Sequence, residues 1–200
     1  MVPFEPPFRA ATREDAAAMA ELVNVAGENL PLYLWSRMAA PGQSAWEFGR
    51  LRAQREEGAF SYRNTVIVEA ADGGAAGCLI GYPLPKRPDP IPPDLPPLFR
   101  PLQELENFAP ATWYVNVLAV YPEHRGRGLG VSLLALADRI AADLGSSGLS
   151  IIVSDANAGA RRLYERRGYR EAATRPMVKD GWENAGRNWV LLVRGLAASG

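Results

Sequence analysis

The sequence is poor in the residues that build covalent and metal sites. It has one cysteine, Cys78, and one histidine, His124, among 200 residues. A single cysteine excludes an internal disulfide, and one residue of each kind excludes a zinc site assembled from cysteine and histidine. Cys78 lies in an apolar run, so we interpret it as a small core residue rather than a nucleophile. We therefore expect a protein without a metal.

The sequence also lacks an excess of either charge. Lysine and arginine total 22, as do aspartate and glutamate, so the formal net charge is zero. This balance gives no electrostatic case for a nucleic-acid partner. No apolar run approaches the roughly 20 residues that span a bilayer, and the N-terminus does not resemble a signal peptide. We expect a soluble, cytoplasmic protein with no nucleic-acid or membrane partner.

The order of the predicted elements indicates a mixed α/β chain. An apolar content of 48% is enough for one sizeable core, so we expect a single domain over residues 1–200. Residues 29–42 are open between a short helix and a loop over a pocket. The other predictions are strands at 8–11, 64–69, 75–82, 113–120, 149–153, 169–174 and 189–193, and helices at 13–26, 44–57, 100–107, 129–144 and 157–167.

Residues 83–101 interrupt this pattern. The segment holds about half of the chain's 17 prolines, which remove backbone donors and disfavour regular structure. Two interpretations stay open for it. One is an ordinary exposed loop. The other is a loop on the substrate side of a site, because long loops in compact domains are often functional.

A glycine-rich loop follows the almost wholly apolar strand Trp113–Val120. It reads Arg125-Gly126-Arg127-Gly128-Leu129-Gly130 and leads into an apolar-striped helix. Glycine lets the backbone approach a ligand, and the first turn of a helix has free N–H groups and a partial positive charge. This combination favours an anion site suited to phosphates, to which the two arginines add charge.

Two familiar phosphate motifs do not fit this loop. A Walker A loop needs a Gly-Lys-Ser/Thr ending, which is absent. A Rossmann fingerprint needs a third glycine, but Val131 or Leu133 stands there, depending on which glycine begins the motif. The alternative to a phosphate site is a plain turn that joins a strand to a helix. A protein that binds a nucleotide at the same helix start is a further hypothesis.

The stretch from Val120 to Gly130 resembles the acyl-CoA signature of the GNAT superfamily of N-acetyltransferases. The core of that signature, Arg/Gln-x-x-Gly-x-Gly/Ala, is met by Arg125, Gly128 and Gly130. The likeness extends to about residue 172, through the strand at 149–153, Asn157, Tyr164 and Gly168-Tyr169. The resemblance implies a mostly antiparallel sheet with one parallel pair splayed around the cofactor and flanked by helices. It also implies acetyl-CoA as co-substrate.

The resemblance further implies which residues bind acetyl-CoA. The backbone at the end of the central strand would pair with the pantetheine, and the loop amides would hold the pyrophosphate. Asn157 would contact the pantetheine or its surroundings. The residues so assigned are Leu118, Ala119, Val120, Arg125, Gly126, Arg127, Gly128, Leu129, Gly130, Val131, Asn157 and Tyr164.

Tyr164 is the first candidate for a catalytic residue. The resemblance places such a tyrosine near the thioester sulfur, where it would protonate the leaving thiolate. Asn157 and Tyr164 are seven residues apart, close to two helical turns, so they share one face of a helix. The alternatives are a helix cap for Asn157 and a core aromatic for Tyr164.

The base that deprotonates the amine is less clearly marked. Some GNAT enzymes use a glutamate on or near the central strand, but Trp113–Val120 contains no acid and only one amide, Asn116. Asn116 would orient a substrate or a water molecule. Glu106 and Glu104 lie just upstream, and Glu106 is the first choice as base, against a solvated helix carboxylate. His124 is interpreted as a surface residue.

We therefore predict an N-acetyltransferase that transfers an acetyl group from acetyl-CoA to a primary amine in a ternary complex. The alternative is a CoA-binding sensor or interaction module without catalysis. The absence of an acidic residue from the strand Trp113–Val120 favours this alternative. The acceptor, a small molecule or a peptide, is not readable from the sequence. A homodimer is an expectation from the family alone.

Overall fold

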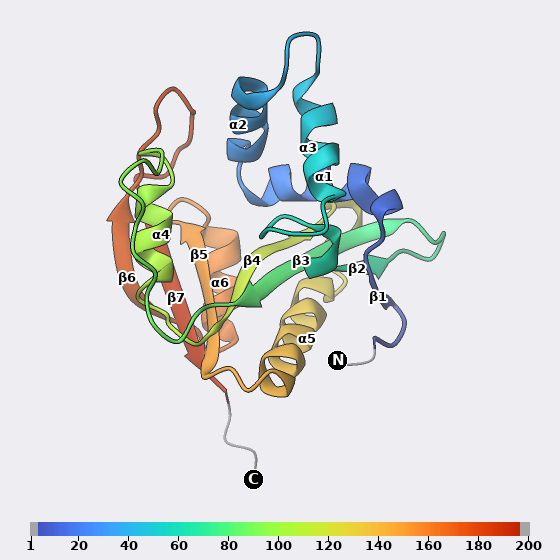
Figure 1. Ribbon diagram of the computed structural model, residues 1–200. Coiled ribbons are helices and arrows are strands. Elements are labelled where there is room, and N and C mark those ends of the chain that lie inside the picture. Colours follow the sequence, from blue (N-terminus) through green and yellow to red (C-terminus); the bar gives the residue numbers. More distant parts are fainter. Residues whose placement is uncertain (1–3, 197–200) are drawn as a thin grey trace. The chain divides into compact units, whose positions relative to one another are not determined.

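The computed structural model describes residues 4–196 and divides them into two compact units (Figure 1). The first unit comprises residues 4–81 and 116–135, and the second comprises 82–115 and 136–196. Each unit therefore combines segments that are far apart in the chain. The expectation of a single domain stays a prediction.

The first unit contains four strands or parts of strands and the helices near the N-terminus. Its elements are β1 (Phe8–Ala10), the 3-10 turn η1 (Arg13–Asp15), α1 (Ala16–Ala26), α2 (Leu30–Met38), α3 (Ala45–Ala53), η2 (Tyr62–Asn64), β2 (Thr65–Glu69), most of β3 (Ala75–Pro83), the end of β4 (Trp113–Val120), η3 (Pro122–His124) and the start of α5 (Leu129–Asp143).

The second unit contains the elements near the C-terminus and the start of β4. Its other elements are α4 (Arg100–Glu106), β5 (Gly148–Ser154), α6 (Ala158–Arg166), β6 (Arg170–Pro176) and β7 (Asn188–Gly195). Strands β3 and β4 and helix α5 each run from one unit into the other.

The seven strands form a mixed sheet in the order β1-β2-β3-β4-β5-β7-β6. In the first unit β2 pairs antiparallel with β1 and with β3, around the predicted Asp72-Gly73-Gly74 turn. In the second unit β4 and β5 run parallel, with Trp113 opposite Leu149, and β7 pairs antiparallel with both β5 and β6. One parallel pair in an otherwise antiparallel set confirms the predicted sheet.

Local signals explain where the first helices begin. The carboxylate of Asp15 accepts hydrogen bonds from the Thr12 amide (2.7 Å) and hydroxyl (3.2 Å), which closes the predicted cap. At the start of α3 the bonds are reciprocal: the Ser44 amide donates to the Glu47 carboxylate at 2.9 Å, and the Glu47 amide donates to the Ser44 hydroxyl at 3.2 Å. These caps satisfy amides that the first turn leaves without partners.

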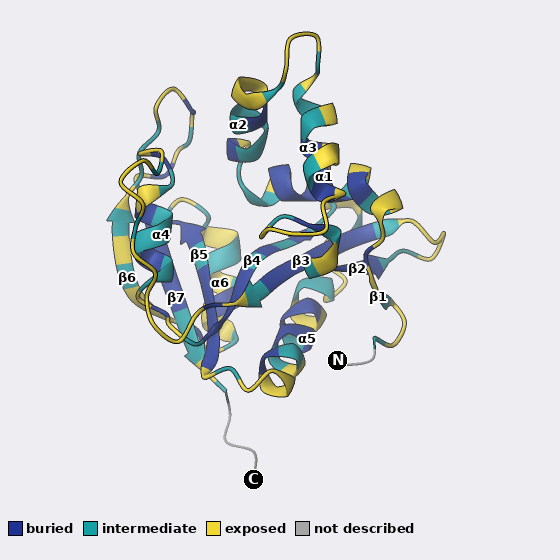
Figure 2. Cartoon of the chain, in the orientation of Figure 1, coloured by how far each residue is buried: buried dark blue, intermediate teal, exposed yellow. Residues whose placement is uncertain are grey.

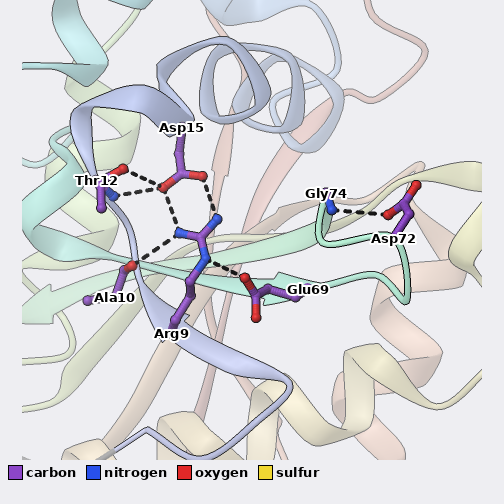
Figure 3. A network of polar contacts seen from close by, with 7 residues as sticks. All are labelled: Arg9, Ala10, Thr12, Asp15, Glu69, Asp72 and Gly74. Atoms are coloured by element: carbon purple, nitrogen blue, oxygen red, sulfur yellow. Dashed lines mark hydrogen bonds and ion pairs between the residues drawn. The ribbon is translucent and has the colours of Figure 1, made fainter.

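Arg9 ties these first elements together (Figure 3). Its guanidinium donates to both Asp15 oxygens at 2.8 Å and to Glu69 on β2 at 2.8 Å. Burial raises the pKa of the Asp15 carboxyl, whereas its hydrogen bonds with Arg9 and Thr12 lower it. The net result is a lowered pKa for Asp15. One side chain thus links β1, β2 and η1.

The core of the first unit is apolar and rich in aromatic rings. Met19 and Leu22 from α1 pack with Ile67, Cys78 and Ile80 from the sheet. Figure 2 colours much of these strands dark blue, as buried. The Trp35 ring stacks on Phe60 at 5.8 Å between centroids and meets the edge of Trp46 at 6.2 Å. Burial of Cys78 confirms its interpretation as a core residue.

Several predicted boundaries need correction. Residues 13–26 begin as a 3-10 turn before α1, and α3 ends at Ala53 instead of Glu57. The open segment 29–42 is a helix, α2, over most of its length. Strand β4 is buried on both faces only over Trp113–Val115, and from Asn116 onward half-buried and buried residues alternate. The all-apolar composition of β4 hid this change.

Gly49 on α3 yields a stability prediction. A Cβ there would lie 2.5 Å from two atoms of the Trp35 ring, which Phe60 and Trp46 hold in place. We expect Gly49→Ala to lower the free energy of unfolding by about 1–3 kcal/mol, although alanine is the better helix former.

Gly159 on α6 is the matched control, because a Cβ there meets only the Asn157 side chain, at 3.9 Å. Gly159→Ala should be neutral or stabilise by up to about 1 kcal/mol. Urea unfolding of both variants measures the difference, and equal effects would contradict the packing argument.

Candidate active site

The glycine loop has the backbone shape that its sequence predicted. Gly126 and Gly128 have φ angles of 73° and 80°, in the left-handed region that favours glycine. No atom lies within 4 Å of a Cβ placed on either residue, so conformation and not crowding requires glycine there. The two residues turn the chain from η3 into the first turn of α5.

In the described part of the chain, the turn leaves several backbone amides without a hydrogen-bond acceptor. The amides of Val131 and Ser132 both donate to the Gly128 carbonyl at 3.0 Å. Within residues 4–196 no acceptor is assigned to the amides from Gly126 to Gly130. Consecutive free N–H groups at a helix start bind anions, so this loop suits the pyrophosphate of a coenzyme.

The two arginines of the loop are used partly to hold its shape. Arg125 donates from Nε to the Val120 carbonyl at 3.0 Å, and Arg127 donates to the Glu123 carbonyl at 3.2 Å. Both side chains remain exposed. The loop charge is therefore fixed near the end of β4, and the Val120 carbonyl, predicted to meet the pantetheine, already accepts one bond.

The end of β4 presents two different faces. Val117 and Ala119 are buried in the core of the first unit with Ile67 and Cys78. Asn116, Leu118 and Val120 alternate with them and are half-buried. The predicted cofactor contacts of β4 and the predicted orienting amide, Asn116, thus belong to the same unit as the glycine loop.

Asn157 and Tyr164 lie on α6 in the second unit. The Asn157 side chain caps this helix by accepting a bond from the Ala160 amide at 3.1 Å, as the sequence predicted. Tyr164 is 5% exposed, and its ring lies 5.8 Å from that of Tyr169. Burial raises the pKa of Tyr164, and no hydrogen-bond partner of its hydroxyl is found in the described chain. A protonated phenol without a partner is suited to donate to a ligand.

Glu106 lines a pocket at the end of α4. The pocket has a volume of about 250 Å³ and lies wholly in the second unit. Its walls come from the end of β3, the proline-rich loop and α4, and the lining residues are Tyr82, Pro83, Leu84, Pro85, Pro88, Asp89, Gln103, Glu106, Asn107 and Pro110. The first residues of the proline-rich segment therefore form part of a pocket wall, although residues 85–90 are exposed.

The two candidate glutamates of α4 have different environments. Glu104 forms an ion pair with Arg175 of β6 at 2.7 Å, and the same guanidinium lies 4.9 Å from the Phe108 ring. In the described chain Glu106 has no such cation, and burial raises the pKa of its carboxyl to about 7. A carboxyl that titrates near neutral pH is suited to accept a proton. A fully solvated helix carboxylate, the alternative considered from the sequence, would not have this property.

Two tyrosines that the sequence did not mark lie near Glu106. Tyr82 and Tyr114 meet edge to face, with 5.5 Å between their ring centroids. Burial, and after it the charge of Glu106, raises the pKa of both phenols. Their positions at a strand end and in a buried strand are typical of core aromatics, so no sequence signal separates them from packing residues.

Comparison with known proteins identifies the family. The model of the acetyltransferase (GNAT) family matches residues 31–169, which is more than half of the chain. This chain belongs to the GNAT family. It is therefore an N-acetyltransferase. No curated protein matches the sequence.

Solved structures show the same fold for this acetyltransferase. One acetyltransferase has 21% identity and a TM-score of 0.65, over 95% of this chain and 99% of that one. An N-acetyltransferase from Staphylococcus aureus Mu50 has 16% identity and a TM-score of 0.62, over 94% and 99%. Ard1 from Thermoplasma volcanium has 14% identity and a TM-score of 0.60, over 95% and 97%. At these identities the likeness concerns the fold.

Over residues 4–196, no three histidine, cysteine, aspartate or glutamate side chains are grouped so as to hold a metal ion. None of the helices over the same residues combines the length and apolar character needed to cross a bilayer.

Burial of Glu106 predicts a stability change with pH. Its pKa is about 7 in the folded acetyltransferase against 4.5 in the unfolded chain, so the folded state holds the proton more tightly. This contribution is present below pH 4.5 and is lost as the pH rises to 7, by roughly 3 kcal/mol.

Glu106→Gln should remove that loss, because an amide does not ionise. The variant should therefore gain stability relative to the wild type between pH 5 and pH 8, as measured by urea unfolding at both pH values. Glu104→Gln is the control and should leave the slope unchanged. A wild type and Glu106→Gln whose stabilities change in parallel would show that Glu106 is not desolvated.

Proposed function

We propose that this acetyltransferase moves an acetyl group from acetyl-CoA to a primary amine by direct attack in a ternary complex. The observation that carries the proposal is Glu106, a mostly buried carboxyl without a cation that lines a pocket of substrate size. Family membership supplies the reaction class, and the free amides of the glycine loop supply a fitting site for a pyrophosphate.

On the donor side, the chain would act mainly through its backbone. The amides from Gly126 to Gly130 would bind the pyrophosphate, helped by the charges of Arg125 and Arg127. Leu118, Ala119 and Val120 would offer strand-end backbone groups to the pantetheine, and Asn157 would contact it or cap α6 only. Acetyl-CoA supplies a thioester carbonyl that an amine attacks.

On the acceptor side, Glu106 would remove the proton that makes an ammonium group unreactive. The amine nitrogen then forms the new bond to the carbonyl carbon, and the bond from that carbon to sulfur breaks. Tyr164 would give its proton to the departing sulfur and recover one from the solvent. Asn116 would orient the acceptor or a water molecule.

Removal of the Glu106 carboxylate tests the base assignment. For the wild type we expect kcat/KM to rise with pH through an apparent pKa of about 7. Glu106→Gln should lower kcat/KM by about 10²–10⁴-fold and abolish this limb, because the amide cannot accept the proton. Release of free thiol from acetyl-CoA measures the rate with a panel of amines.

Glu104→Gln is the matched control, since Glu104 lies on the same helix but is paired with Arg175. It should retain the pH limb. Both variants should keep the thermal stabilisation that acetyl-CoA gives the wild type. Tight acetyl-CoA binding without thiol release from any amine would favour the non-catalytic sensor instead.

Tyr164→Phe tests the acid assignment. We expect kcat to fall by about a hundredfold at pH 7, since the sulfur would leave without a proton donor. The defect should shrink as the pH rises past about 8.5, the ordinary pKa of a thiol, because a thiolate is then stable.

Tyr169→Phe is the control for Tyr164. Its hydroxyl is buried without a partner, and its ring contacts that of Tyr164. Loss of the Tyr169 hydroxyl should leave kcat nearly unchanged. If Tyr164→Phe also kept full turnover across this pH range, the acid role would be wrong.

A further inference from the structure

The pocket beside Glu106 has an unusual balance of polar groups. Its lining includes two carboxyl side chains, Asp89 and Glu106, and two amides, Gln103 and Asn107, but no lysine or arginine. Lys86 and Arg87 are the nearest cations along the proline-rich loop, and both are exposed and outside the lining. The fixed charge that the pocket offers a ligand is therefore negative.

Each of the two amides of the pocket uses one of its two N–H donors within the protein. Asn107 donates from Nδ2 to the Asp89 carbonyl at 2.9 Å, which holds the proline-rich loop against α4. Gln103 donates from Nε2 to Asn107 Oδ1 at 3.5 Å. The groups that remain are the two carboxyl groups, the Gln103 side-chain oxygen, the Tyr82 hydroxyl and one N–H of each amide, and only the carboxyl groups among them can carry a charge.

Two further backbone bonds hold the start of the loop against the segment that follows α4. The Leu84 amide donates to the Thr112 carbonyl at 2.8 Å, and the Ala111 amide donates to the Pro85 carbonyl at 2.9 Å. Figure 1 shows this green loop running beside α4. The pocket wall is thus braced by bonds that do not involve a ligand, so its size and its polarity are properties of the free protein.

We propose that the acceptor is a compact amine that carries a second cationic group and no anionic group. The inference rests on the proposed function and names the acceptor for the same site. The reacting amine would lie at Glu106, and the distal ammonium would lie at Asp89, on the exposed side of the pocket. Ammonium groups are donors only and positively charged, so they complement a pocket whose charged groups are carboxyl acceptors.

The same observations argue against other classes of acceptor. An amino acid or a phosphorylated amine would bring an anion to a pocket with two carboxyl groups and no cation. A volume of about 250 Å³ is below the range of pockets that hold drug-sized ligands, so a large glycoside would extend beyond the pocket.

Matched sets of acceptors test the proposal on the full chain. Putrescine, butylamine and γ-aminobutyrate share one reacting amine and one chain length but end in an ammonium, a methyl and a carboxylate group. Cadaverine, pentylamine and δ-aminovalerate repeat the comparison one carbon longer. We expect kcat/KM to fall in that order within each set, about 3- to 5-fold from diamine to monoamine, as for an exposed ion pair.

Asp89→Asn should remove the advantage of the diamine over the monoamine by raising KM while leaving kcat unchanged. Asp94→Asn is the control, because Asp94 lies in the same loop but outside the lining. The advantage of the diamine should also shrink at high salt, since Asp89 is exposed. Calorimetric titration with the same compounds gives the order of affinity without turnover.

The outcomes separate this inference from the proposed function. Equal rates within both sets, or a preference for the carboxylate, would overturn the acceptor class while acetyl transfer stood. An advantage of the diamine that Asp89→Asn leaves intact would also overturn it. Thiol release from none of these amines or of a wider panel would overturn the proposed function, and this inference with it.

Discussion

The structure depends most on β4, because this one strand belongs to both units. Its first residues pair in parallel with β5, and its last residues, Val117 and Ala119, complete the core of the first unit. Gly77 on β3 reflects the same constraint, since a Cβ there would lie 2.4 Å from the Ala119 carbonyl. Any change in the path of β4 would move the glycine loop that follows it, so packing and cofactor binding are linked through one backbone.

Glu106 shows how a site of this kind trades stability for reactivity. A carboxyl that is mostly removed from water and has no cation makes the folded state less stable once it ionises. Glu104, which lies two residues from Glu106 on the same helix, forms an ion pair with Arg175 of β6 instead. The ion pair also links α4 to β6. In the proposed mechanism the unpaired Glu106 would be the residue that accepts the proton.

Much of the fold could be predicted from the sequence because its signals are local. Ser44 with Glu47 marks a helix start, Asp72-Gly73-Gly74 marks a hairpin turn, and Gly126 and Gly128 mark a turn into a helix. The alternation of faces in β4 after Val115 could not be predicted, since both faces carry mostly apolar residues. The role of the proline-rich loop also stayed open, because it depends on contacts with α4.

The two halves of the candidate site differ in what a sequence can reveal. Phosphate binding by backbone amides needs glycine at fixed spacings, and such spacing is visible in the letters themselves. Acceptor binding depends on which polar atoms remain after the protein has satisfied its own. The Asn107 side chain shows this, because its sequence position says only that an amide is present, whereas its bond to the Asp89 carbonyl removes a donor from the pocket. The hydrogen bonds within the protein therefore decide which pocket atoms are left to bind an acceptor, and these bonds are visible only in the structure.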